Sequence, residues 1–307
     1  HTAYEFLAED QVIPFIESVL RVFDRHGERN SRHKARMKFL IQKIGFEEFM
    51  NLVNAETKAL KNHSFAIADA SAWEVAEPSL KADIKAPETA EYQTWLETNT
   101  FEQKQKGFHA VYVRILNGNI SSGTSRSLIE ALNGYIGDDI RITINQGLML
   151  KFVPTANLPY VFQVLNAHGL AAPGANSIAN ITACPGTDTC NLAISDSTHI
   201  TSKLEEVINE EFPALIHDSA MKIKISGCMN ACGQHSMASI GFHGSSLKAA
   251  DKRVLPALQV LIGGATLGNG EGRIADKVIK VPSKRGPEVL RVLLNNFEEN
   301  AQDGEYF

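Results

Sequence analysis

Apolar residues recur at helical spacing at the start of the chain. The pattern in residues 11–26 predicts one helix, and a second helical pattern follows a break at Gly27 and continues to about residue 53. Residues 55–104 lose this periodicity and become polar. We therefore expect a long connector with short extended pieces there, a length of loop that usually carries a function or joins two domains.

Residues 105–172 show a clearer succession of strand and helix patterns. Alternating β-branched residues predict strands, and apolar residues three or four positions apart predict helices. The order is strand, helix, strand, strand, helix, which predicts a ferredoxin-like β-α-β-β-α domain. A short Gln146-Gly147 turn separates the two middle strands, and Gly169 ends the last helix. The elements are expected over residues 109–116, 125–136, 138–145, 148–153 and 157–170.

The rest of the chain mixes helices and strands. We expect a helix from Cys190 towards Glu211, and Asp188 and Thr189 are candidates to cap it. Strands are expected over residues 221–226, 236–244 and 256–264, a glycine-rich loop over 263–273 and a closing helix over 287–300. The predicted fold class is α+β, with a helical segment (1–60), a connector (61–104), the ferredoxin-like domain (105–172) and a mixed α/β domain (173–307).

Composition excludes several classes of protein. The 307 residues are 44% hydrophobic, enough for about two globular domains and too many for a disordered chain. Apolar runs fall well short of the ~20 residues that a membrane-spanning helix needs, so we expect a soluble protein without a membrane partner. The net charge of −5 argues against general affinity for nucleic acid.

The cysteines are the most informative part of the composition. Four cysteines are too few for a secreted disulfide framework, and we expect a cytoplasmic location. They form two pairs, Cys184 and Cys190 as C-x5-C and Cys228 and Cys232 as C-x3-C, in turns rich in glycine, proline and asparagine. Four buried thiols are one interpretation, and a structural zinc site is another, although zinc usually takes C-x2-C to C-x4-C pairs.

An iron–sulfur cluster fits this spacing better than zinc does. Four thiolates from two turns must surround a group larger than one ion, which favours wider spacing. Backbone N–H groups in glycine-rich turns also stabilise the anionic sulfides.

The pattern resembles the siroheme and [4Fe–4S] sulfite/nitrite reductase family. The resemblance rests on C-x5-C with Pro185 after its first cysteine and on GCMNACG around the second pair. Residues 32–45, 101–115 and 141–147 are also similar to segments of that family. The resemblance implies that residues 173–307 form a siroheme and [4Fe–4S] domain. It implies that Cys184, Cys190, Cys228 and Cys232 ligate the cluster, that Cys232 also bridges it to the siroheme iron as the catalytic residue, and that Asn230 packs against the macrocycle.

A basic stretch adds candidates for siroheme binding. Residues 21–43 carry eight basic and two acidic side chains, and Arg25, Arg29, Arg32 and Arg36 fall on one stripe at helical spacing; a solvated helix face is the common alternative for such a run. Siroheme is a polycarboxylate, which such donors bind well. The resemblance therefore implies siroheme-carboxylate contacts from Arg32, Lys34, Arg36 and Lys38, and it implies cofactor contacts from Thr143 and Gln146 on the hairpin.

Other residues near these motifs receive more ordinary roles. His235 and His243 follow the second cysteine pair closely, and we expect them to pack or to support the site rather than to ligate iron. Arg273, in the glycine-rich segment, is a weak candidate for an anion site.

The resemblance implies the C-terminal part of a siroheme-dependent sulfite reductase. Such an enzyme reduces sulfite to sulfide with electrons from ferredoxin or a flavoprotein. The alternatives are a nitrite reductase of the same family and, in another class, a non-catalytic iron–sulfur or zinc-binding module. In the family, much of the siroheme and substrate site lies in an earlier half, so we expect that these residues alone do not complete the active site and that siroheme can be absent from them.

Overall fold

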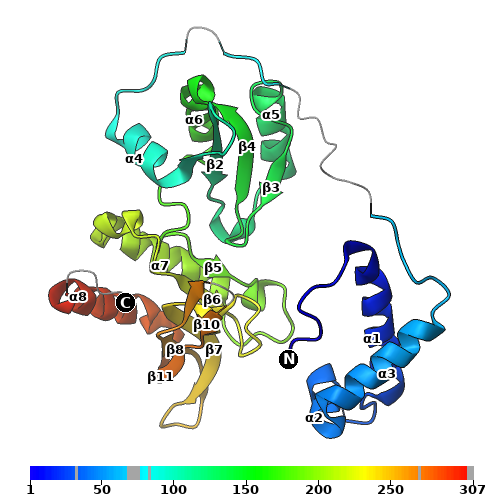
Figure 1. Cartoon of the computed structure of the whole chain (residues 1–307). Helices are drawn as coiled ribbons and strands as arrows, with labels where there is room; N and C mark the ends of the chain where they lie inside the picture. The colour runs from blue at the N-terminus through cyan, green and yellow to red at the C-terminus, as the bar shows by residue number, and fades with distance from the viewer. Residues whose placement is uncertain (32–33, 68–76, 82–83, 269–270, 303–307) are drawn as a thin grey trace. The chain divides into compact units, whose positions relative to one another are not determined.

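The computed structural model describes residues 1–31, 34–67, 77–81, 84–268 and 271–302. The chain divides into two compact units, His1–Glu74 and Val75–Phe307. Figure 1 shows the elements of each unit along the chain. No helix in the described part of the chain is long and apolar enough to cross a membrane.

Three α-helices form the core of the first unit in its described residues. These are α1 (Val12–His26), α2 (Met37–Ile44) and α3 (Phe46–Ala59), whose apolar faces meet in a small core. Gly45 separates α2 from α3 at a φ of 85°, a conformation that favours glycine. The predicted second helix is therefore two helices, because the chain turns sharply at this residue.

The predicted basic stripe is wrong as a single helical face. Helix α1 ends at His26, and α2 begins only at Met37, so Arg29 and Arg36 lie outside both helices. Arg25 instead pairs with the buried Glu56 of α3. Spacing counts place residues on one face only within a continuous helix, and this stretch is interrupted.

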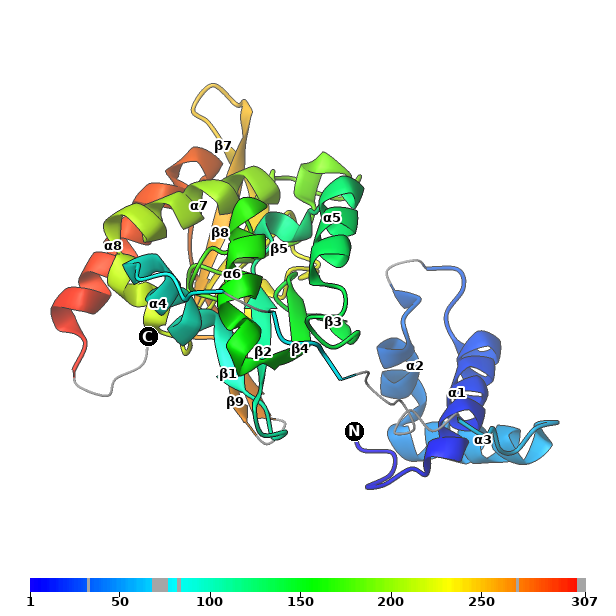
Figure 2. The same cartoon turned by 90° about the horizontal axis from the view of Figure 1, so that it is seen from above.

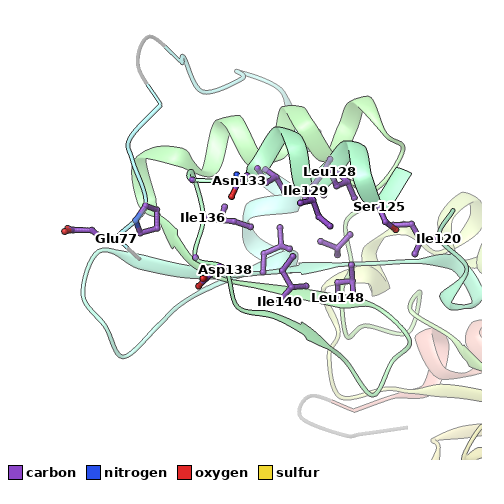
Figure 3. A pocket seen from close by; sticks show the side chains of 17 residues that line it. Glu77, Ile120, Ser125, Leu128, Ile129, Asn133, Ile136, Asp138, Ile140 and Leu148 are labelled. Atoms are coloured by element: carbon purple, nitrogen blue, oxygen red, sulfur yellow. The ribbon is translucent and has the colours of Figure 1, made fainter. Parts of the chain in front are cut away.

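The ferredoxin-like prediction is confirmed in the second unit. A four-stranded antiparallel sheet has the order β1-β2-β4-β3, and helices α5 and α6 pack against it. In Figure 3 the two helices lie along one side of the sheet. The elements are β1 (Thr100–Glu102), β2 (Phe108–Val113), α5 (Ser122–Leu132), β3 (Ile140–Ile142), β4 (Leu148–Pro154) and α6 (Leu158–Ala167).

The predicted connector contains a helix that the sequence pattern did not indicate. Helix α4 (Ala90–Asn99) buries Tyr92 and Trp95 against α6, where both rings contact Phe162. Strand β1 follows it directly and pairs with β2. The end of the connector therefore belongs to the ferredoxin-like core. Its helix lacks a regular apolar stripe because two aromatic rings supply its buried surface.

A mixed five-stranded sheet forms the remainder of the second unit. Its order is β11-β8-β7-β6-β5, with β5, β6 and β7 parallel and the other pairs antiparallel. Helices α7 (Ser197–Glu211) and α8 (Gly286–Asn300) lie side by side and share the main core with the central strands (Figure 2). The strands are β5 (Thr182–Ala183), β6 (Ile223–Ser226), β7 (Ile240–Lys248), β8 (Val254–Ile262) and β11 (Asp276–Pro282).

Two predictions in this region are wrong in detail. The helix expected from Cys190 begins at Ser197, where the Asp196 carboxylate accepts a hydrogen bond from the His199 N–H. The backbone N–H groups of Ile194 and Ser195 are used elsewhere, because they donate to the Gly227 carbonyl. The glycine-rich loop forms a small two-stranded sheet of β9 (Ala265–Gly268) and β10 (Glu271–Arg273).

Buried polar groups connect the two sheets of the second unit. Asn99 is fully buried at the end of α4. Its amide nitrogen donates to the carbonyls of Tyr112 and Ala172, and its amide oxygen accepts from the Ala175 N–H. One side chain thus ties the ferredoxin-like sheet to the segment that leads into β5.

We expect Asn99→Ala to lower the free energy of unfolding by about 2 kcal/mol, because the buried Ala175 N–H and two partly buried carbonyls lose this partner. Urea unfolding of the full chain measures this change. Asn166→Ala, at an exposed position of α6, is the control and should change stability by less than about 0.5 kcal/mol. Equal stability of the two variants would contradict the role given to Asn99.

Candidate metal centre

The four cysteines leave neighbouring strands at the same edge of the mixed sheet. Strand β5 ends at Ala183, and Cys184 follows it; β6 ends at Ser226, and Cys228 follows two residues later. The two strands are parallel neighbours, with Ala183 opposite Ile225. Because the carboxyl ends of parallel strands share one edge, the loop of residues 184–190 and the loop of residues 227–233 begin side by side.

Direct hydrogen bonds join the two loops. The Gly227 N–H lies 3.1 Å from Cys184 Sγ and donates to it. The Cys184 N–H donates to the Ile225 carbonyl over 3.2 Å, which continues the β5–β6 ladder by one residue. An N–H that points at a cysteine sulfur stabilises the thiolate form, which is the form that ligates metals.

Glycines allow this close approach. A Cβ atom at Gly227 would lie 2.6 Å from the Cα of Gly186 in the other loop. A Cβ at Gly233, directly after Cys232, would lie 2.0 Å from the Ile225 carbonyl oxygen. A side chain at Gly227 would push the two loops apart, and one at Gly233 would push the second loop away from strand β6.

The two cysteines of the second loop differ in their exposure to solvent. Cys228 is buried, whereas Cys232 is exposed, and Met229 and Asn230 between them are exposed as well. Ala231 adopts a φ of 58°, in the left-handed region that L-residues other than asparagine and aspartate rarely occupy. Such strained backbone often marks a functional site, and here it directs the last cysteine towards the surface.

The two loops carry all four cysteines of the chain. All four are free thiols. Among the described residues, no three His, Cys, Asp or Glu side chains come together as ligands of one ion. A cluster requires one thiolate at each of several irons and N–H donors near the sulfurs. The Gly227 N–H beside Cys184 Sγ is such a donor.

Gln146 lies next to the first cysteine loop, and both Gln146 and Thr143 have partners within the chain. Both polar atoms of the Gln146 amide bond to the backbone of Ala183, at 2.7 and 2.8 Å. Thr143 Oγ1 accepts from the Gly147 N–H and closes the turn. The structure therefore gives these two residues contacts that hold the hairpin and strand β5.

The basic candidates belong to the first unit. Lys34 lines a cavity of about 480 Å³ together with His26, Arg29 and Lys43. Arg36 precedes α2 with an extended backbone, and Lys38 lies 5.1 Å from the ring centre of Phe39. Arg32 falls outside the described residues. Glu28 lines the same cavity, and Arg29 pairs with Asp24 at 3.1 Å, so the positive charges there are partly neutralised within the chain.

His235 and His243 are buried together behind the second cysteine loop. Their ring centres are 4.8 Å apart. The His235 Nδ1 lies 2.9 Å from Ser226 Oγ, which itself accepts from the Gly233 N–H. Burial, followed by the nearby charges of His243 and Lys277, lowers the pKa of His235 to about 4. A neutral His235 therefore supports the loop that carries Cys232.

A buried ion pair behind β5 escaped the sequence analysis. The Arg114 guanidinium donates to the carbonyls of Pro173 and Ala179 and pairs with Glu205 at 3.2 Å. Burial lowers the pKa of Arg114 and raises that of Glu205, while their mutual attraction acts against both shifts. The sequence offered one signal for this pair: Arg114 directly follows the apolar residues at the end of strand β2.

The apolar cavity in Figure 3 lies in the ferredoxin-like domain, away from the cysteine loops. It measures about 510 Å³ and is enclosed mainly by α5 and the strands of the ferredoxin-like sheet, with Leu128, Ile136 and Leu148 among its lining side chains. None of its lining residues is a cysteine, a lysine or an arginine. It therefore does not belong to the candidate metal centre.

Two family models match the chain. The model described as the nitrite and sulphite reductase 4Fe-4S domain matches residues 1–61 and 174–306, and the model described as the nitrite/sulfite reductase ferredoxin-like half domain matches residues 101–168. Together they cover both units of the structure.

Curated relatives are similar over nearly the whole chain. A sulfite reductase [ferredoxin] of Mycobacterium tuberculosis (strain ATCC 25618 / H37Rv) is 28% identical over 94% of this chain and 49% of its own length. A ferredoxin–nitrite reductase of Synechococcus elongatus is 25% identical over 94% of this chain and 51% of its own length. The chain thus spans about half the length of these relatives.

Solved structures share the fold. The structure of the Mycobacterium tuberculosis NirA protein aligns with a TM-score of 0.70 at 24% identity, over 96% of this chain and 51% of that one. Dissimilatory sulfite reductase I aligns with a TM-score of 0.51 at 10% identity, over 64% of each chain. The α+β fold predicted from the sequence is confirmed.

The low pKa of His235 predicts a pH-dependent stability. The folded chain binds this proton only near pH 4, whereas the unfolded chain binds it near pH 6.5, so the unfolding free energy should fall as the pH drops through this window. His235→Gln should make this decline shallower, by at most about 1.4 kcal/mol per pH unit. Urea unfolding of the cluster-free chain between these limits measures it.

His199→Gln, at an exposed position of α7, is the matched control and should leave the slope unchanged. An identical pH slope for wild type and His235→Gln would show that His235 does not contribute.

Proposed function

The chain belongs to the nitrite and sulphite reductase family, and we propose that it acts within a siroheme-dependent enzyme that reduces sulfite to sulfide. Membership of this family implies two cofactors, a [4Fe–4S] cluster and siroheme, as the sequence resemblance also does. The observation that carries the proposal is the meeting of two glycine-lined cysteine loops at one sheet edge. When bound, the cluster would pass on electrons from the electron donor, and siroheme would supply the iron at which the anion is reduced.

Cys184, Cys190, Cys228 and Cys232 are the proposed cluster ligands, with Cys232 as the bridge to siroheme. The contact between Cys184 Sγ and the Gly227 N–H supports a thiolate at the first position. The exposure of Cys232, after a strained Ala231, supports a ligand that reaches a second group outside the loop. Asn230, exposed beside it, is proposed to pack against the macrocycle.

Basic side chains of the first unit are proposed to bind the carboxylates of siroheme. Lys34 and Lys43 line one cavity of this unit, beside Glu28 and the Asp24-paired Arg29, and the two amines support an anionic group there. Arg32, Arg36 and Lys38 belong to the same proposal on the family resemblance. Thr143 and Gln146 are proposed near the cofactor because their hairpin contacts the residue before Cys184.

Nitrite is the second candidate substrate. The similarity to a ferredoxin–nitrite reductase, at 25% identity, supports it nearly as well as the 28% similarity to a sulfite reductase supports sulfite. The segment ACPGTDTC resembles bacterial sulfite reductases more than plant-type nitrite reductases, which favours sulfite. We propose a small anionic substrate, a ferredoxin or flavoprotein electron donor and a cytoplasmic location.

Cysteine replacement tests the cluster directly. We expect the purified chain to carry about four irons and four acid-labile sulfides, and Cys184→Ala or Cys228→Ala to lose most of both. Met229→Ala is the matched control, because this exposed sulfur-containing residue lies in the same loop but has no proposed role. Chemical assay of iron, sulfide and zinc measures the outcome.

Stoichiometric zinc without sulfide would contradict the proposal and support the structural zinc module. A cluster without siroheme or turnover, in the complete enzyme, would indicate the non-catalytic iron–sulfur module. Production of sulfide from sulfite, or of ammonia from nitrite, by the complete enzyme with reduced ferredoxin decides between the two substrates.

A further inference from the structure

Gln146 joins the ferredoxin-like sheet to the mixed sheet. It lies in the turn between β3 and β4 and is half-buried. Its Nε2 donates to the Ala183 carbonyl over 2.7 Å, and its Oε1 accepts from the Ala183 N–H over 2.8 Å. A single side chain thus satisfies both backbone polar groups of one residue, 37 positions away.

Ala183 lies on the edge strand of its sheet. Strand β5 has β6 on one side and no strand on the other in the described sheet order. On that free edge the Gln146 amide supplies the donor and the acceptor that a further strand would supply. The Gln146 side chain therefore makes the two hydrogen bonds to Ala183 that the backbone of a neighbouring strand would otherwise make.

The capped residue directly precedes the first cysteine. Ala183 is 2% exposed, and its neighbour Cys184 forms its own ladder bond to Ile225. The backbone at the base of this loop is held from both sides, by Ile225 in β6 and by Gln146 from the other sheet. A cysteine that leaves such a doubly bonded strand end has little freedom of position.

Several contacts within the turn fix the backbone conformation of Gln146. The residue has a φ of 61°, a conformation that is unfavourable for any residue with a Cβ atom. The Thr143 N–H donates to the Gly147 carbonyl, the Gln146 N–H donates to the Thr143 carbonyl, and Thr143 Oγ1 accepts from the Gly147 N–H. A Cβ atom at Gly118 would lie 3.1 Å from the Cβ of Gln146, so the neighbouring segment also leaves room for it. Strain that persists under so many contacts points to a functional requirement.

We propose that Gln146 is a positioning residue that fixes Cys184 as a metal ligand from the ferredoxin-like domain. It acts through Ala183, without touching the cysteine sulfur. The part of this inference that concerns the metal rests on the proposed function. The part that concerns the position of the strand end stands on the geometry alone, and the experiment separates the two.

Hydrogen exchange in the full chain tests the positioning without any cofactor. Gln146→Gly removes the amide and relieves the unfavourable φ, so the variant should fold and keep the turn bond between the Thr143 N–H and the Gly147 carbonyl. Exchange at the Ala183 N–H should become about tenfold faster, because a buried strand end has lost two hydrogen bonds. Gln146→Ala should give the same change at Ala183.

Gln103→Ala is the matched control, since the Gln103 Oε1 also accepts a backbone N–H, that of Phe152, over 2.7 Å in the same domain. It should speed exchange at Phe152 and leave Ala183 unchanged. Unchanged exchange at Ala183 in Gln146→Gly, with the turn bond still protected, would overturn the proposal.

Two further readouts distinguish positioning from general stability. In the cluster-free chain, alkylation of Cys184 by iodoacetamide should become several-fold faster in Gln146→Gly relative to Cys190 in the same molecule. In the holoenzyme, the electron paramagnetic resonance spectrum of the reduced cluster should shift in Gln146→Gly and not in Gln103→Ala. Equal alkylation and an unchanged spectrum would overturn the role of Gln146 at the ligand.

If wild type carries no cluster, the proposed function fails, and the exchange result still decides whether Gln146 holds the strand end.

Discussion

The close approach of two backbone loops at one sheet edge is the constraint on which the candidate site depends. Gly186 and Gly227 contact each other where any Cβ atom would collide, and Gly233 lies against the Ile225 carbonyl in the same way. These contacts bring Cys184 within a hydrogen bond of the loop that carries Cys228. Without the glycines, the parallel strands would still be neighbours, but their cysteines would diverge.

The two sheets of the second unit are joined by polar groups rather than by a continuous apolar layer. Asn99 and the Arg114–Glu205 pair hold the segment between the sheets, and Gln146 holds the strand end that follows it. Buried polar contacts of this kind have strict geometry, because an unmatched donor or acceptor is costly. The ferredoxin-like domain therefore sets the position of the cysteine loops as well as providing its own core.

Much of this arrangement follows from the sequence, and the remainder depends on tertiary contacts. The strand and helix order of the ferredoxin-like domain is visible in the periodicity, and the cysteine spacing indicates the cluster. Helix α4 is not visible, because Tyr92 and Trp95 bury it without a regular stripe. The start of α7 at Ser197 is not visible either, because it depends on a distant contact: the backbone N–H groups just before it donate to the Gly227 carbonyl. The partner of Gln146 lies in another sheet, so no local pattern predicts it.

The central claim is that the two cysteine loops hold one iron–sulfur cluster. Mössbauer spectroscopy of the full chain, loaded with isotopically enriched iron, tests it most directly, because the spectrum reports how the irons share electrons and sulfide. We expect the single, valence-averaged pattern of a [4Fe–4S] cluster in the oxidised chain, lost in Cys184→Ala and retained in Met229→Ala. The pattern of an isolated iron ion in four thiolates, or no specifically bound iron, would contradict it.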